Sequence, residues 1–158
     1  MKYLTMILFI VLNVTNTSCQ SIKGKGFEGC IFDKEHFALV SIKNQKSIRY
    51  TPSKDDILKA EKLLKESIKQ MYSPLVNQRE GCPIIHKNLK KYVRQYLGFV
   101  NNEGKKIIWI NFLWKKGGLT EGISKDIVNV SDGCSHYWKV KVNLATGKLF
   151  DLKINGSA

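Results

Sequence analysis

An apolar stripe with helical spacing between residues 53 and 72 restricts the fold of this chain more than any other feature. Its members follow steps of three and four residues, which places them on one face of a helix: Ile57, Ala60, Leu64, Ile68 and Met71. Ser53 and Asp56 have the spacing of a capping box, and the residue before Pro74 disfavours helical backbone. The pattern therefore predicts one long amphipathic helix over residues 53–72.

The segments around this helix have the composition and alternation of β-strands. Strands are predicted at residues 37–43, 92–100, 106–114, 126–130, 137–144 and 149–154. One helix followed by sequential hairpins predicts an α+β fold, with the long helix packed on an antiparallel sheet of about four to five strands. This element order resembles the cystatin-like and NTF2-like folds, and that resemblance implies no function.

Length and composition fit one globular domain with a buried core. The chain has 158 residues, of which 43% are hydrophobic and 25% are charged. These values exclude a disordered tail, a collagen-like chain, a coiled coil and a polytopic membrane protein. The 26 Lys and Arg residues outnumber the 13 Asp and Glu residues, so the formal net charge is +13. Such a charge favours anionic partners and indicates nothing about the fold.

The first 18 residues have the pattern of an export signal. Lys2 supplies a positive charge, and residues 3–14 are apolar apart from Thr5 and Asn13. A helix over this run would span about 18 Å, which is shorter than the hydrocarbon core of about 30 Å. A short apolar run behind one positive charge is typical of secretory signals, so residues 1–18 are predicted to be a signal peptide.

Residues 16–20 resemble a bacterial lipobox, in which small residues precede a cysteine that becomes the lipid-modified N-terminus. Two small residues stand directly before Cys19, whereas Asn16 departs from the usual aliphatic residue. The resemblance implies that acyl chains on Cys19 hold the mature chain on a membrane. Because Gln20 is not the aspartate of inner-membrane lipoproteins, the resemblance also implies the outer membrane. Residues 21–26 lack the acidic cluster that accompanies surface display, which favours a domain that faces the periplasm. The alternative is ordinary cleavage near Ser18, which releases a secreted protein.

The mature chain is predicted to consist of a tether and one domain. Residues 19–29 include three glycines and two lysines and are predicted to form a flexible, lipid-attached tether. Residues 30–158 then form a single α+β domain. Within it, residues 94–99, 101–112 and 131–156 look like small, uncharacterised lipoproteins of the Bacteroidota. This resemblance implies an envelope location and carries no activity.

The other cysteines, Cys30, Cys82 and Cys134, are expected to form one disulfide after export, and the sequence leaves all three pairings open. Zinc is not expected, because Cys134 with His136 is a weak motif by itself. A nucleophile built on Cys82 or Cys134 with a histidine is an alternative that nothing in the sequence orients. No phosphate loop, dinucleotide fingerprint or serine elbow occurs, so no catalytic residue, metal or cofactor is predicted.

The side of the last strands that faces away from their apolar stripe carries lysines and aromatic residues. We predict an open face that binds anionic ligands through Trp109, Tyr137, Lys139, Lys141 and Lys153. After export, the expected partners are anionic glycans, lipopolysaccharide, lipid head groups or an envelope protein, and nucleic acid is not expected. The alternative is a solvated sheet face without a ligand, with Trp109 partly covered by residues 115–125.

These observations predict an envelope lipoprotein that acts as a non-catalytic binding or scaffolding module and reaches the membrane through its lipid anchor. Two alternatives stay open. One is a soluble secreted binder of anionic glycans or lipids, and the other is a small hydrolase with an unrecognised site.

Overall fold

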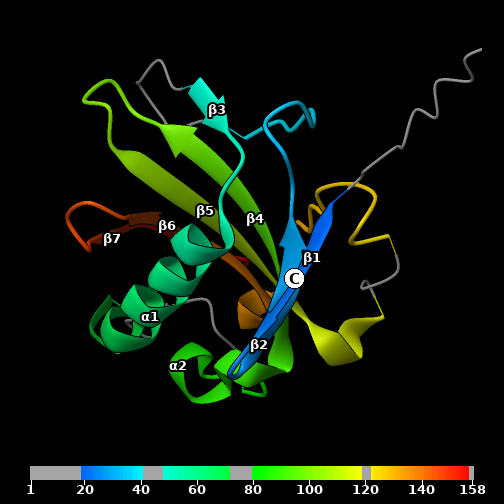
Figure 1. Ribbon diagram of the computed structural model, residues 1–158. Coiled ribbons are helices and arrows are strands. Elements are labelled where there is room, and N and C mark those ends of the chain that lie inside the picture. Colours follow the sequence, from blue (N-terminus) through cyan, green and yellow to red (C-terminus); the bar gives the residue numbers. More distant parts are fainter. Residues whose placement is uncertain (1–18, 41–47, 72–79, 119–121, 157–158) are drawn as a thin grey trace, which may run out of the picture.

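The computed structural model describes residues 19–40, 48–71, 80–118 and 122–156 (Figure 1). The predicted signal peptide, residues 1–18, lies outside these residues. One sheet contains seven strands: β1 (Gln20–Gly24), β2 (Phe27–Ile31), β3 (Ile48–Tyr50), β4 (Tyr92–Val100), β5 (Lys106–Trp114), β6 (Tyr137–Asn143) and β7 (Leu149–Ile154). Five helical segments accompany it: α1 (Lys54–Met71), α2 (Ile85–Asn88), and the 3-10 turns η1 (Leu89–Lys91), η2 (Lys115–Gly117) and η3 (Cys134–His136).

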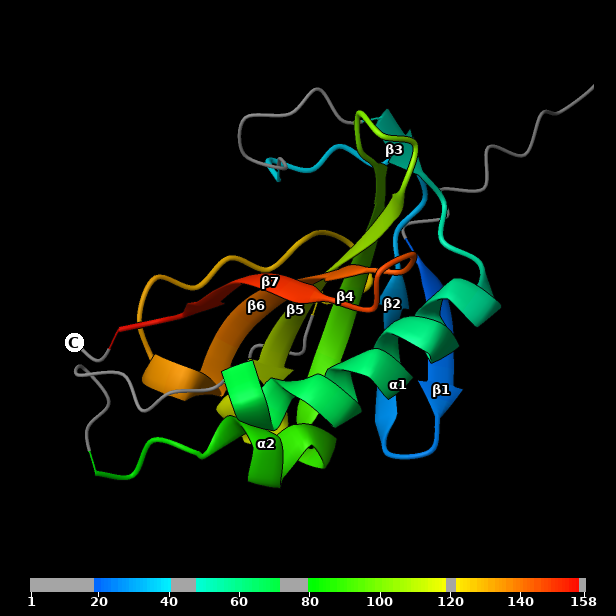
Figure 2. The ribbon, with the colours of Figure 1, turned by 90° about the vertical axis from the view of Figure 1, so that its left-hand side faces the viewer.

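The sheet is mixed, and it is larger than the sequence predicts. Its strand order is β1-β2-β4-β5-β6-β7, and β3 pairs with β4 beside this path. Strand β2 runs parallel to β4, whereas the other pairs are antiparallel. The predicted antiparallel sheet of four to five strands, with its cystatin-like or NTF2-like order, is therefore wrong. The N-terminal hairpin supplies two extra strands and the parallel pairing (Figures 1 and 2).

Residues 19–29 form most of this hairpin and are not the flexible tether that their glycines predict. Gly26 has a positive φ of 88° in the turn between β1 and β2. A Cβ at Gly29 would collide with the backbone carbonyl of Arg94 on the neighbouring β4. Glycine therefore permits a turn at one position and close strand pairing at the other.

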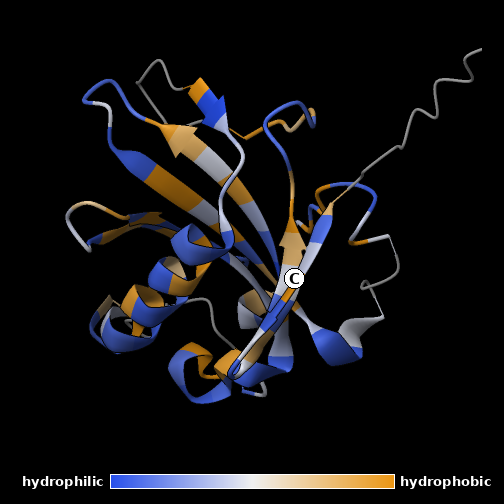
Figure 3. Ribbon diagram, in the orientation of Figure 1, coloured by the Kyte–Doolittle hydropathy of each residue, from blue (hydrophilic) through white to orange (hydrophobic). Residues whose placement is uncertain are grey.

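The long helix agrees with its sequence pattern. Helix α1 covers residues 54–71, and Ile57, Ala60, Leu64 and Ile68 are buried. The Ser53 N–H donates to Asp56 Oδ2 at 3.2 Å, and the Asp56 N–H donates to Ser53 Oγ at 3.1 Å, which confirms the capping box. Figure 3 shows the alternation of apolar and charged residues along α1.

Both faces of the sheet are buried, and the candidate site lies on the second of them. On one face, the apolar side of α1 packs on residues such as Tyr96, Ile110 and Trp138. On the other face, a second cluster contains Phe32, Leu97, Phe99, Ile107, Trp109 and Cys30. The predicted strands at 37–43 and 126–130 are not strands where the structure describes them: residues 37–40 and 127–130 are irregular segments, and residues 41–43 lie outside the described part.

Candidate functional site

The second face of the sheet is covered by residues 122–130, which Gln95 on β4 holds in place. Gln95 is fully buried, and its Nε2 donates to the carbonyls of Ile123 at 2.9 Å and Asp126 at 2.7 Å. Its Oε1 accepts hydrogen bonds from Val128 N at 2.9 Å and Asn111 Nδ2 at 3.1 Å. Gln95 and Asn111 on the strands thereby supply hydrogen-bond partners for backbone groups of residues 122–130, which form no helix or strand.

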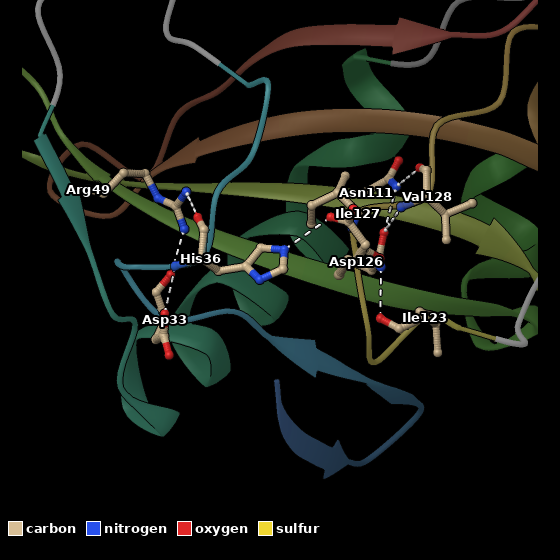
Figure 4. Close-up of polar contacts among 9 residues, drawn as sticks. Asp33, His36, Arg49, Asn111, Ile123, Asp126, Ile127 and Val128 are labelled. Atoms are coloured by element: carbon tan, nitrogen blue, oxygen red, sulfur yellow. Dashed lines mark hydrogen bonds and ion pairs between the residues drawn. The ribbon is translucent and has the colours of Figure 1, made fainter. Parts of the chain in front are cut away.

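Residues 32–40 cover the same face from the other side (Figure 4). Arg49 on β3 donates to the carbonyls of His36 at 3.1 Å and Asp33 at 2.8 Å. The His36 ring reaches the other covering segment, because its Nε2 lies 3.1 Å from Asp126 Oδ1. The Ile127 N–H and then the His36 ring lower the pKa of the Asp126 carboxyl. The two segments are therefore joined to each other as well as to the sheet.

This cover corrects the predicted open face. Trp109 and Lys141 are each only 3% exposed. Trp109 packs in the second cluster, beside which the covering residues Ala38, Val40 and Ile127 also pack. The covering residues that pack beside this cluster therefore lie outside the predicted cover, residues 115–125. The sequence alternation identifies which residues share a face, but it does not show that distant segments fold over that face.

A cleft of about 190 Å³ remains between the covering segments and the last two strands. We call it the lysine cleft, and its lining residues are Leu39, Val40, Trp109, Asn129, Lys139, Lys141, Asp151 and Lys153. Four of the five residues predicted for the anion-binding face are among them. The fifth, Tyr137, borders a separate void of about 10 Å³, which is close to the volume needed for one water. Partial burial, and then Asp132, raise the pKa of the Tyr137 hydroxyl.

Asp151 is the one charged residue lining the cleft that the predicted anion-binding face omitted. The register of β6 and β7 shifts between Lys139 and Lys141, so β7 carries an extra residue there. Asp151 occupies this bulge with a positive φ of 52°. Its Oδ2 lies 2.7 Å from Lys141 Nζ, and its Oδ1 lies 3.8 Å from Lys153 Nζ. A left-handed aspartate at a bulge between lysines is a strained arrangement of the kind that accumulates at binding sites.

Lys139 and Lys153 stand directly opposite each other on β6 and β7, and both line the cleft. Lys139 is half-buried and Lys153 is exposed. Like charges in opposite positions destabilise a strand pair. The cleft contains three ammonium groups and one carboxylate, so it has an excess of two positive charges. Among the described residues, no carboxylate forms an ion pair with Lys139. An anion between these two lysines would offset their repulsion.

A second, larger hollow adjoins the lysine cleft. Its volume is about 520 Å³, and it shares Lys141 and Asp151 with the cleft. We call it the adjoining groove, and it extends to the β4–β5 and β6–β7 turns, where it is lined by Asn101, Lys105, Asn143, Thr146 and Lys148. The two hollows together are lined by five lysines, by the carboxylates of Glu103 and Asp151, and by neutral polar and apolar side chains.

The four cysteines form two disulfides, Cys19–Cys30 and Cys82–Cys134, with Cα–Cα distances of 5.6 and 6.1 Å. Cys82–Cys134 is one of the three pairings that the sequence left open. The bridge to Cys19 was not expected, because Cys19 was assigned to lipid attachment. A Cys19 sulfur that is bonded to Cys30 carries no acyl glyceride, so this structure and the lipid anchor exclude each other.

Comparisons with known proteins give this chain no relative. No protein-family model matches it, and no curated protein and no solved structure is significantly similar to it. Among the described residues, no group of three or more His, Cys, Asp or Glu side chains has the arrangement of a metal site. In the same part of the chain, no helix combines the length and the apolar character needed to cross a membrane.

Proposed function

We propose that this chain is an exported, non-catalytic binding module whose lysine cleft holds the acidic groups of an anionic glycan. The observation that carries the proposal is the opposed pair Lys139 and Lys153, which line a cleft that contains three lysines and a single carboxylate. Two opposed lysines repel each other and reduce stability unless an anion lies between the two ammonium groups.

The adjoining groove favours a glycan over a small free anion. Its volume of about 520 Å³ adds a long path beside the cleft, and Asn101, Asn143 and Thr146 offer amide and hydroxyl groups along it. Such groups hydrogen-bond sugar hydroxyls, and Lys148 adds a positive charge, whereas Lys105 is paired with Glu103 at 2.8 Å. Lipopolysaccharide and an acidic envelope protein present similar charges, and they are the other ligands to test.

Export is supported by two independent features. The apolar run at residues 3–14 has the pattern of a secretory signal. Both disulfides also fit an oxidising compartment outside the cytosol. We therefore propose the soluble exported form, with Cys19 bonded to Cys30. The outer-membrane lipoprotein that the lipobox-like residues imply is the competing proposal, and it requires a Cys19 sulfur that is free for acylation.

Intact mass of the protein purified from its native host separates these two forms. We expect an unacylated mature chain that begins near Cys19 and lacks the four hydrogens lost in forming two disulfides. After denaturation without a reductant, no cysteine should react with an alkylating reagent. An acylated mass with one alkylated cysteine at Cys30 would reject the exported disulfide form and support the anchored one.

Glycan binding is tested by reversing the charges of the opposed lysines. We expect the double variant Lys139→Glu and Lys153→Glu to bind heparin and polygalacturonate about tenfold more weakly at low ionic strength. The affinity of the unchanged protein should also fall as salt is added, because the contacts are ionic. Fluorescence anisotropy of the labelled polymers measures both effects. Lys141 is left unchanged, because it is buried and paired with Asp151.

A matched control carries the same change in net charge elsewhere. Lys62 and Lys65 are exposed on α1, which packs on the opposite face of the sheet. The double variant Lys62→Glu and Lys65→Glu should therefore retain most of the affinity. Equal losses in the two double variants would show that net charge alone attracts the polymer, and would contradict a specific cleft. Binding of neutral dextran with equal affinity would contradict anion recognition.

A further inference from the structure

The Cys82–Cys134 disulfide lies beside an imidazole, which the proposed glycan binding does not use. The Cys134 sulfur lies 3.5 Å from His136 Nδ1. The same Nδ1 lies 3.0 Å from the carbonyl oxygen of Gly133. Because a carbonyl oxygen only accepts hydrogen bonds, this contact places a proton on Nδ1. In the disulfide form, the Gly133 carbonyl accepts this N–H, and the Cys134 sulfur lies within reach of the same donor.

Contacts other than the disulfide hold this site together. The Ser135 hydroxyl donates to the carbonyl of Pro83 at 2.6 Å, which joins the two cysteine-bearing segments independently of the sulfur atoms. Tyr92 OH donates to the carbonyl of Ser135 at 2.6 Å. The His136 ring also packs edge-on against Trp114, with 5.1 Å between the ring centroids. The two sulfurs and the imidazole are thus expected to stay close together when the disulfide is opened.

The two sulfurs of the bridge differ in their surroundings. Cys134 is only 5% exposed and lies against His136, whereas Cys82 is partly exposed. An incoming thiolate therefore has access to Cys82, and the sulfur it displaces is the one beside the N–H donor. A leaving thiolate that accepts a hydrogen bond is stabilised, and thiol–disulfide exchange is faster when the leaving thiolate is more stable.

We propose that Cys82–Cys134 is an exchange-active disulfide that oxidises dithiols, with Cys82 as the attacked sulfur and Cys134 as the leaving thiolate. In the first step, a thiolate of the dithiol bonds to Cys82 Sγ. The Cys82–Cys134 bond breaks, and its electron pair leaves on Cys134 Sγ, which accepts a hydrogen bond from His136 Nδ1–H. In the second step, the other thiol of the dithiol gives its proton to the Cys134 thiolate and attacks the dithiol sulfur that is bonded to Cys82. Cys82 leaves as a thiolate and takes a proton from water, the dithiol becomes a disulfide, and the protein holds both electrons as two thiols.

The second disulfide of the chain serves as an internal reference. Among the described residues, no histidine nitrogen lies within hydrogen-bond distance of the Cys19 or Cys30 sulfur. Dithiothreitol is the probe, applied at about pH 7 to the mature protein with both disulfides intact. The reaction is stopped with acid, free thiols are alkylated, and peptide mapping then follows each bridge separately.

His136 is replaced in two ways to separate its N–H from its packing. His136→Phe keeps a ring against Trp114 and removes the donor, and we expect Cys82–Cys134 to be reduced about tenfold more slowly. His136→Asn places an amide N–H near the position of Nδ1 and should stay within about twofold of the unchanged protein. The rate for Cys19–Cys30 should be the same in all three proteins. Equal rates for Cys82–Cys134 in all three, or equal slowing of both bridges, would overturn the proposal.

A measurement on the unchanged protein tests the proposal even if a variant fails to fold. After reduction, one thiol should titrate at least about one unit below the ordinary thiol value of about 8.5, as followed by ultraviolet thiolate absorbance. Selective alkylation should assign this thiol to Cys134. A Cys134 thiol that titrates at or above the ordinary value would overturn the proposal, because His136 would then not stabilise the leaving thiolate.

Discussion

Replacing Arg94 with leucine is expected to lower the free energy of unfolding by about 3–5 kcal/mol, because it leaves a buried carboxylate without its counter-ion. Arg94 is 1% exposed on β4, and its Nε lies 2.9 Å from Oε1 of Glu61, which is itself 10% exposed on α1. Tyr96 OH also donates to this oxygen at 2.9 Å. These contacts form a buried polar link between α1 and the sheet. Urea unfolding followed by circular dichroism measures the loss.

The pH dependence of this loss identifies its cause. Burial raises the pKa of Glu61 above its ordinary value of 4.5, against the opposing effect of Arg94. Since the native state takes up the proton more readily than the unfolded state, the contribution of Glu61 to stability increases as pH falls from the raised pKa towards 4.5. Removing Arg94 raises the pKa further. The Arg94→Leu variant should therefore be less destabilised at about pH 4 than at about pH 8.

A double variant provides the matched control for the ion pair. When Arg94→Leu is combined with Glu61→Leu, no buried charge is left, and much of the lost stability should return. A loss that is the same at both pH values, together with a double variant no more stable than Arg94→Leu, would contradict the ion-pair explanation. The loss would then come from the packing of the arginine side chain, whose guanidinium carbon lies 5.2 Å from the centre of the Phe112 ring.

Replacing Gln95 with leucine is expected to cost about 3–4 kcal/mol, because four hydrogen bonds of roughly 1 kcal/mol each are lost together. They are the bonds to the carbonyls of Ile123 and Asp126 and from the nitrogens of Val128 and Asn111. Residues 122–130 should then separate from the sheet, and trypsin should cut faster after the exposed Lys125. Urea unfolding and the rate of this single cleavage measure the two effects.

The surface contact between the same segments is the matched control for Gln95. The His36 ring bonds to an Asp126 carboxylate whose side chain is 77% exposed. His36→Gln should therefore cost at most about 1 kcal/mol and should leave the cleavage after Lys125 nearly unchanged. Because Asn129 belongs to the covering segment and lines the lysine cleft, Gln95→Leu should also weaken glycan binding. Unchanged stability in Gln95→Leu would contradict its role in holding the cover.

The parts of the fold that follow from local periodicity were predictable. The predicted helix over 53–72 matches α1 (Lys54–Met71), and the strands predicted at 92–100 and 106–114 match β4 and β5 residue for residue. The same alternation placed Lys139, Lys141 and Lys153 on one face, and all three line one cleft. Each of these features depends on neighbours within a few residues, and the sequence displays such neighbours directly.

Glycines were the main source of error in the fold. Residues 19–29 were predicted to be flexible because this short segment combines lysines with glycines, among them Gly26 and Gly29. In the structure, they permit the β1–β2 turn and the close approach of β2 to Arg94. The parallel pairing places Gly29 opposite Arg94, which lies far along the chain, and no local sequence pattern predicts that partner.

The sequence by itself determined the amphipathic helix, the two C-terminal hairpins, the excess of positive charge and the row of lysines. Only the tertiary structure decided that this row lies beneath a cover, that Asp151 joins it through a bulge, and that Cys19 pairs with Cys30. The physical reason is that the residues in contact lie far apart in the sequence. Gln95 binds a carbonyl 28 residues away, and Ser135 binds one 52 residues away. Such contacts form only when the whole chain is folded, because they depend on packing between segments and not on the propensities of either one.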